Sequence, residues 1–111
     1  MLGASDLPYY FMKTYLEKKN NSNLDYQLKK KFLTTIGANN TSYNASSAFK
    51  KNRIVPSEID NYFRHKTLVG FVHDMGAAMQ GGIGGHAGLF SNSNDVAKIM
   101  QMYLQRGLYG G

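Results

Sequence analysis

The sequence predicts a mainly α-helical chain with three to four helices separated by long loops. Three observations lead to this prediction. Apolar residues recur at helical spacing in three segments, residue types typical of helix ends flank those segments, and the alternation typical of strands is almost absent. The 111 residues fit one domain, and an apolar fraction of 42% with eight Tyr and six Phe is typical of a folded chain.

The first helix is expected to run from Leu7 to about Lys19. Asp6 stands at the N-cap position, where a side-chain oxygen can accept hydrogen bonds from free backbone amides, and Pro8 suits the first turn. The polar run 20–23 ends the apolar periodicity, so we expect the helix to stop there.

A second helix is expected from Leu24, because Leu24, Leu28 and Phe32 recur every four residues on one face. Gly37 offers the left-handed conformation that commonly ends a helix. The following segment 38–56 is polar and rich in Asn and Ser, which predicts a long loop. Loops of that length are uncommon in compact domains and are often functional.

Between residues 57 and 71 the apolar residues follow no clear period. This segment is therefore expected to be irregular, with a short extended piece at 69–72. One helical turn is expected at 75–79, before a glycine-rich segment.

The last helix carries the clearest signals. Asn92 followed three residues later by Asp95 resembles a capping box, and the acid suits the positive end of the helix dipole. Arg106 and Gly107 are expected to close the helix. Its spacing produces one apolar stripe, formed by Val96, Ile99, Met100, Tyr103 and Leu104.

Composition excludes several functional classes. The net charge of +6 comes mostly from lysines at expected helix ends and faces, a pattern typical of a solvated surface, so no nucleic-acid partner is expected. The chain has no cysteine, which excludes disulfides and thiol catalysis within it. No run approaches the roughly 18 apolar residues of a membrane span, so none is expected in this chain.

Two strings carry a resemblance to a known family. The glycine-rich segment 81–91 leading into Asp95-Val96-Ala97 resembles the serine β-lactamase-like proteins, which include class C β-lactamases, penicillin-binding proteins and related esterases. His73-Asp74, followed by Gly-Gly-Ile-Gly-Gly-His-Ala-Gly-Leu-Phe-Ser, resembles more narrowly the β-lactamase-like module that follows a family 3 glycoside hydrolase domain in some exported bacterial proteins.

The resemblance implies that residues 1–111 are a single partial domain, the helical portion of an α+β β-lactamase/transpeptidase-like fold. Family members attack an amide or ester with the serine of a Ser-x-x-Lys motif, helped by a Tyr-x-Asn motif and a later Lys-Thr-Gly or His-x-Gly strand. The nucleophile is then expected outside these residues, and the chain alone is expected to be inactive. No cofactor is implied.

The resemblance also assigns a candidate catalytic position to Asp6. This residue matches the third position of a degenerate Tyr-x-Asn motif, in which Ala4 stands where the tyrosine is expected. Residues 1–4 are either native sequence or residues added for expression, so a natural loss of the tyrosine and a cut inside the motif stay open as alternatives. A plain N-cap role for Asp6 is favoured over a catalytic one.

Three further residues are candidates for lining a cleft, namely His73, Asp74 and His86. A carboxylate beside an imidazole fixes its tautomer for acid–base work, so His73 and Asp74 would form such a pair, and His86 could reach the same pocket. Adjacent side chains seldom point at one another, so structural roles are favoured for both histidines. No metal site is expected, because a third ligand is lacking and His65, between two basic residues, is a poor one.

Two other patterns match known motifs only literally. Ser-Ala-Phe-Lys at 47–50 satisfies Ser-x-x-Lys and Ser-Tyr-Asn at 42–44 satisfies Ser-x-Asn, but their order is reversed and no Lys-Thr-Gly follows, so no catalytic site is expected there. Gly82, Gly84 and Ala87 fit a dinucleotide fingerprint, yet no strong strand precedes them. These glycines are expected to permit a tight turn and close backbone approach.

Two functional classes follow from the resemblance. In the favoured one, the chain supplies one wall of the cleft of a serine hydrolase located in the periplasm or cell envelope. In the other, it is a noncatalytic module that binds or packs against peptidoglycan or a neighbouring glycosidase domain. The expected partners are the remainder of the β-lactamase-like domain, a glycosidase domain and, through uncovered apolar surface, a second copy of the chain.

Overall fold

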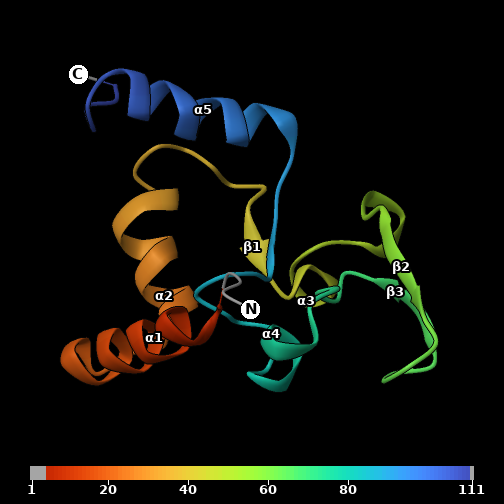
Figure 1. The fold of residues 1–111 in the computed structure, drawn as a ribbon. Helices are drawn as coiled ribbons and strands as arrows, with labels where there is room; N and C mark the ends of the chain where they lie inside the picture. Colours follow the sequence, from red (N-terminus) through yellow and green to blue (C-terminus); the bar gives the residue numbers. More distant parts are fainter. Residues whose placement is uncertain (1–4, 111) are drawn as a thin grey trace.

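The computed structural model describes residues 5–110, so Ala4 in the degenerate Tyr-x-Asn motif lies outside the described residues. Figure 1 shows α1 and α2 on one side of the molecule, the hairpin of β2 and β3 on the opposite side, and α5 at one end. The helices and strands follow in the order α1 (Leu7–Asn20), α2 (Leu24–Leu28), β1 (Ser42–Tyr43), α3 (Ala45–Ala48), β2 (Pro56–Asp60), β3 (Lys66–Val69), α4 (Met75–Met79), β4 (Leu89–Phe90) and α5 (Ser93–Leu104).

Helix α1 begins and ends close to its predicted limits, but Asp6 does not cap it with its side chain. Pro8 lies in the first turn, and Asn21 ends the helix with a left-handed φ of 49°. Asp6 has helical backbone angles, not the extended ones that let an N-cap side chain turn back to the helix. The hydroxyl of Ser5 instead accepts a hydrogen bond from the Leu7 amide at 3.3 Å. The predicted N-cap role of the Asp6 side chain is therefore wrong.

Helix α2 continues directly into a π-helical turn at Lys29–Leu33, and Gly37 then takes the predicted left-handed conformation with a φ of 73°. The apolar face of this segment builds the main core cluster. Leu33, Ile36 and Ala38 are buried, and Leu28, Ile99 and Met102 pack against them. This cluster therefore joins the α2 segment to α5.

Segment 38–56 is not the structureless loop that its composition predicts. β1, α3 and a 3-10 turn at Lys51–Arg53 divide it into short elements. β1 pairs with β4 in antiparallel orientation, with Tyr43 opposite Leu89. A strand of two residues is too short to show alternation, and its partner lies far along the chain, so neither local pattern nor composition could reveal it.

Residues 56–69 form a β-hairpin where an irregular segment was expected. β2 and β3 pair in antiparallel orientation, with Ile59 opposite Thr67 and an irregularity between Pro56 and Glu58. Asp60 holds the turn, because its carboxylate accepts hydrogen bonds from the amides of residues 62–64 and from Arg64 Nε. The turn of this hairpin is held by one polar side chain, and its strands show no regular apolar alternation, which is why periodicity did not predict it.

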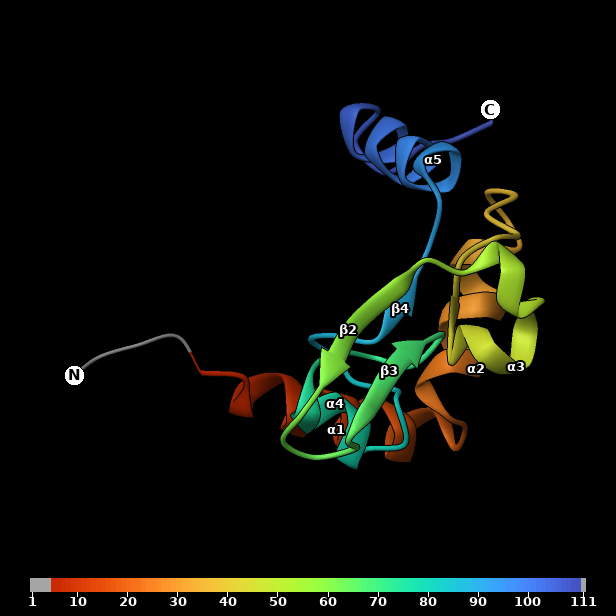
Figure 2. The same cartoon turned by 90° about the vertical axis from the view of Figure 1, so that its right-hand side faces the viewer.

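Helices α4 and α5 lie where they were predicted. The side chain of Asn92 caps α5 by accepting a hydrogen bond from the Asp95 amide at 2.8 Å. The predicted apolar stripe of α5 remains largely uncovered, since Ile99 packs on the core whereas Val96, Met100, Tyr103 and Leu104 are exposed. Figure 2 shows α5 at one end of the molecule, reached through the segment that follows β4. Among residues 5–110, no helix has both the length and the apolar character needed to cross a membrane.

Candidate functional site

Three of the four predicted site residues come together in space. Asp6, Asp74 and His86 each place one oxygen or nitrogen atom within 4.8 Å of the other two. Asp6 precedes α1, Asp74 precedes α4, and His86 lies in the glycine-rich loop that follows α4, so three segments converge here. We call this group the Asp6–Asp74–His86 cluster.

Asp74 is held in place by its role as a helix cap. Its Oδ1 accepts a hydrogen bond from the Ala77 amide at 2.7 Å, and the same oxygen lies 2.8 Å from His86 Nε2. The Ala77 amide first, and the hydrogen bond and charge of His86 next, hold the pKa of Asp74 below its ordinary value, although partial burial acts in the opposite direction. Asp74 is therefore a carboxylate at neutral pH and can orient the imidazole.

His86 is almost completely buried, with 7% of its side chain exposed. Tyr10 packs against the imidazole edge-on, with 5.1 Å between ring centroids and 67° between ring planes. The Nδ1 atom of His86 has no hydrogen-bond partner within the described part of the chain. A neutral imidazole that carries its proton on Nε2 donates to Asp74 and leaves only an acceptor unpaired.

Tyr10 was not singled out in the sequence, although one signal was available. It lies four residues after Asp6, and residues at that spacing share one face of a helix. The spacing alone could therefore have suggested that Tyr10 contacts the cluster from α1. What the sequence could not show is which residue of the glycine-rich loop faces it.

Two glycines let α1 approach the loop and α4 closely. A side chain at Gly85 would lie 2.9 Å from the carbonyl oxygen of Tyr9, and one at Gly76 would overlap the hydroxyl of Tyr10. At Gly85 the obstacle is backbone, so a larger residue is excluded for steric reasons, whereas at Gly76 the Tyr10 side chain would have to shift. The close backbone approach expected of the glycine-rich segment is confirmed at Gly85.

Residues of β1 and its flank support the other side of the glycine-rich loop. The hydroxyl of Tyr43 donates a hydrogen bond to the Gly84 carbonyl at 2.8 Å, and Asn44 Nδ2 donates to the Gly81 carbonyl at 2.9 Å. Burial raises the pKa of the Tyr43 phenol, so it remains a protonated donor. An open hollow of about 290 Å³ beside this loop is lined by Tyr43 and residues 84–89.

His73 is not brought to the cluster. Its Nδ1 atom lies 2.9 Å from Glu58 Oε2 on β2, and 69% of its side chain is exposed. Its carbonyl accepts a hydrogen bond from Arg64 Nη2 at 3.0 Å, which ties this segment to the hairpin. His73 and Asp74 thus do not form the imidazole–carboxylate pair considered in the sequence, and Asp74 pairs with His86 instead.

The literal Ser-x-x-Lys string does not form a catalytic pair. Ser47 lies on α3, and its hydroxyl donates a hydrogen bond to the Asn44 carbonyl at 2.8 Å. Ser47 and Lys50 are both exposed. A serine nucleophile requires a base within hydrogen-bonding reach, and Lys50 makes no such bond to Ser47.

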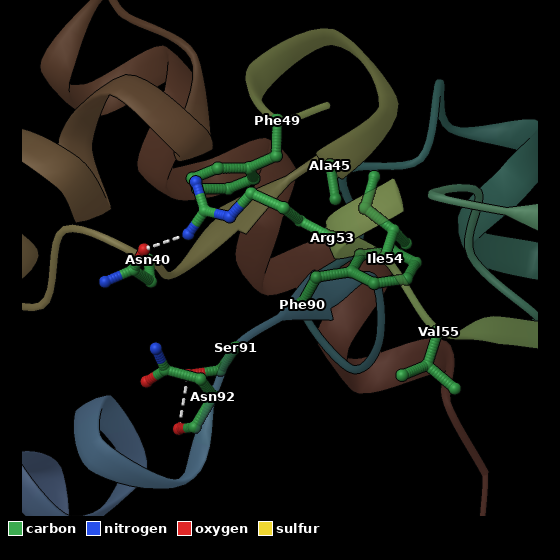
Figure 3. A pocket seen from close by; sticks show the side chains of 9 residues that line it. All are labelled: Asn40, Ala45, Phe49, Arg53, Ile54, Val55, Phe90, Ser91 and Asn92. Carbon is green, nitrogen blue, oxygen red and sulfur yellow. Dashed lines mark hydrogen bonds between the residues drawn. The ribbon is translucent and has the colours of Figure 1, made fainter. Parts of the chain in front are cut away.

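The pocket in Figure 3 lies apart from the cluster. It has a volume of about 170 Å³ and is formed by residues of segments 40–55 and 90–92. Arg53 Nη2 donates a hydrogen bond to Asn40 Oδ1 at 2.9 Å, and its guanidinium lies 5.2 Å from the centre of the Phe49 ring. None of the lining residues carries a carboxylate or an imidazole, so the pocket offers no acid–base pair.

The cluster can hold a proton or a cation, but it contains no nucleophile. An imidazole paired with a carboxylate can accept or donate a proton, and two carboxyl groups close to one imidazole attract positive charge. Covalent catalysis at this place would require a serine or another nucleophile from a different segment.

The chain is similar to one part of several longer bacterial proteins. It is 33% identical to a protein of Escherichia coli strain K12 that is provisionally named a D-alanyl-D-alanine carboxypeptidase, over 96% of this chain and 27% of that protein. It is 32% identical to the N-acetylmuramyl-L-alanine amidase of Bacillus subtilis strain 168, over 95% of this chain and 26% of that protein. The chain therefore spans about a quarter of the length of these relatives.

No protein-family model and no solved structure matches the chain. The similarity to the two relatives covers nearly the whole chain. The chain is thus similar to one part of proteins that are named as cell-wall hydrolases.

Proposed function

We propose that this chain is the helical part of a β-lactamase-like serine hydrolase that cleaves an amide bond of the cell wall through an acyl-enzyme. The similarity along 96% of the chain to a carboxypeptidase and along 95% to an amidase carries this proposal. Both names describe enzymes that break an amide bond at an alanine residue. The proposed substrate is accordingly an alanine-containing cell-wall peptide, and the proposed location of the parent protein is the cell envelope.

The residues present indicate which parts of the active site this chain would supply. The serine nucleophile and its lysine would come from sequence outside residues 1–111, because neither the cluster nor Ser47 supplies a nucleophile with a base. The Asp6–Asp74–His86 cluster would form part of the cleft wall, with Asp6 at the third position of the degenerate Tyr-x-Asn motif. The parent protein would have the α+β β-lactamase/transpeptidase-like fold, and fusion to a family 3 glycosidase domain is part of the same proposal.

Uncovered apolar surface supports the idea of a partial domain. No residue of α1 within the described part is buried, and Phe11 is 74% exposed. On α5, Tyr103 is 69% and Leu104 is 79% exposed. Apolar faces of this kind commonly mark contact surfaces, so the remainder of the domain is the proposed partner of α1 and α5.

One sequence observation favours a second function. Ala4 stands where the family motif has its tyrosine, and loss of that residue would remove part of the catalytic machinery. In this alternative the same fold is a noncatalytic module that binds peptidoglycan or packs against a neighbouring domain.

The two functions can be separated with the complete protein that contains these residues. The purified protein would be incubated with muropeptides that end in D-alanyl-D-alanine and with N-acetylmuramyl-L-alanine peptides, and products would be followed by mass spectrometry. We expect cleavage of one substrate class and a covalent serine adduct with a fluorophosphonate probe. If neither turnover nor a serine adduct is observed, the result would support the noncatalytic module.

The 111-residue chain serves as the matched control. We expect it to hydrolyse neither substrate class, nor an activated ester. Turnover by this chain that disappears in Ser47→Ala would show that the string at 47–50 is catalytic, and the proposed division of labour would then be wrong.

A further inference from the structure

We propose that Asp6, Asp74 and His86 bind a divalent transition-metal cation, with Zn²⁺ as the best fit. One imidazole nitrogen and two carboxylate oxygens within 4.8 Å of one another form a donor set that suits this ion, and a water molecule would complete a four-coordinate site. No metal site was expected from the sequence because a third ligand was lacking. The structure supplies Asp6 as that ligand.

The Asp6 side chain is directed toward the cluster and not toward the helix that follows it. An aspartate directly before a helix usually binds a free amide of the first turn, but Asp6 makes no such hydrogen bond and Ser5 accepts the Leu7 amide instead. The Asp6 carboxyl group lies instead beside Asp74 and His86. No helix-capping requirement therefore explains the position of this side chain.

The charge balance of the cluster is the second argument. The chain has a net charge of +6, yet no Lys or Arg within the described residues forms an ion pair with Asp6 or Asp74. Two carboxyl groups at this separation repel each other when both are ionised. A divalent cation would neutralise both, and it would take the place of the proton on His86 Nε2.

Coordination capacity and access are the third argument. Both hydrogen bonds of the Asp74 carboxylate are made by Oδ1. Within the described residues, Oδ2 makes no hydrogen bond and is available as a metal ligand. His86 is buried and held by Tyr10, whereas 36% of the Asp74 side chain is exposed and Asp6 is exposed. One rigid ligand and two accessible ones are compatible with metal entry from solvent.

Isothermal titration calorimetry with ZnCl₂ on the metal-free 111-residue chain tests this site directly. We expect one Zn²⁺ per chain, and affinity weakened by about tenfold or more in His86→Ala and in Asp6→Asn. His73→Ala and Asp25→Asn are the matched controls, because His73 pairs with Glu58 and Asp25 lies in the first turn of α2. Both controls should retain the affinity of the unsubstituted chain.

Circular dichroism would establish that each variant is folded. Asp6→Asn keeps the test decisive even if His86→Ala unfolds, since Asp6 makes no hydrogen bond to its helix. Absence of saturable binding, or equal affinity in cluster and control variants, would overturn the proposal. The titration measures binding and not turnover, so its failure would leave the proposed hydrolase function untouched.

Discussion

Asp60 and Asp95 are both completely buried, yet they stabilise different kinds of structure. Asp60 accepts hydrogen bonds from the amides of residues 62–64 and pairs with Arg64 at 2.8 Å, so its partners lie within four residues. Asp95 accepts hydrogen bonds at Oδ2 from the Asn40 amide at 2.7 Å and from the Thr41 hydroxyl at 2.9 Å, which are 55 and 54 residues away.

The two aspartates differ in how far along the chain their hydrogen bonds reach. Asp60 shapes a turn, and only Arg64 extends its influence, by donating to the Val72 carbonyl at 2.6 Å. Asp95 decides where α5 begins relative to the core, and Lys98 strengthens this attachment by donating to the Gly37 carbonyl at 2.6 Å. Equal burial of the same residue type therefore has local consequences in the hairpin and global consequences in α5.

Removal of the Asp95 carboxylate should have the largest effect. In Asp95→Ala the Asn40 amide and the Thr41 hydroxyl lose their acceptor in a buried place, which should lower the free energy of unfolding by about 3 kcal/mol. Urea denaturation followed by circular dichroism measures this change. Asp95→Asn keeps one acceptor oxygen and should cost about 1 kcal/mol. A loss below about 0.5 kcal/mol in Asp95→Ala would refute long-range control by this residue.

Two glycines of the glycine-rich loop allow the effect of contacts with other segments on stability to be compared with the effect of local backbone strain. Gly88 has a φ of 121°, and a side chain there would meet the Gly82 carbonyl and the Tyr43 ring, so Gly88→Ala should cost about 2 kcal/mol. Gly81 has a φ of 74° with no atom within 4 Å of the position of a side chain, so Gly81→Ala should cost only about 1 kcal/mol of backbone strain. Similar urea midpoints for the two variants would show that remote contacts do not matter here.

Acid should act on the hairpin through Asp60. The Phe63 amide first, and the Arg64 side chain next, hold the pKa of Asp60 far below its ordinary value. A lowered folded-state pKa stabilises the fold above the unfolded value of about 3.9, and this contribution is lost progressively as pH falls below it. Comparison of urea midpoints for the unsubstituted chain and Asp60→Asn between pH 6 and pH 2 measures it. The gap should narrow below about pH 4, and a constant gap would contradict the role of ionised Asp60.

The exposed pair of His73 and Glu58 should matter least. His73 is 69% exposed, and ion pairs in solvent contribute little, so Glu58→Gln should change the free energy of unfolding by less than about 0.5 kcal/mol. Urea denaturation at pH 6 is the appropriate measurement. If Glu58→Gln lowered the free energy of unfolding as much as Asp95→Ala, the hairpin would be as important for global stability as the attachment of α5.

The sequence identified the members of the candidate site better than their arrangement. Asp6 was chosen from a motif resemblance, Asp74 and His86 were chosen for their acid–base chemistry, and the structure brings the three side chains together. A pair of His73 and Asp74 was considered from the sequence, although structural roles were favoured because adjacent side chains seldom point at one another; in the structure His73 faces Glu58. Tyr10 and Tyr43 were missed because their roles depend on contacts with a loop far along the chain.

The sequence by itself determined the ends of α1 and α5, the left-handed Gly37 and the single turn of α4, since each depends on residues within one or two helical turns. Only the tertiary structure decided the pairing of β1 with β4, the attachment of α5 through Asp95, and the meeting of Asp6 with Asp74 and His86. These features join segments that are far apart in the chain. Local periodicity and capping signals contain no information about contacts between distant segments. These contacts follow from packing and buried hydrogen bonds.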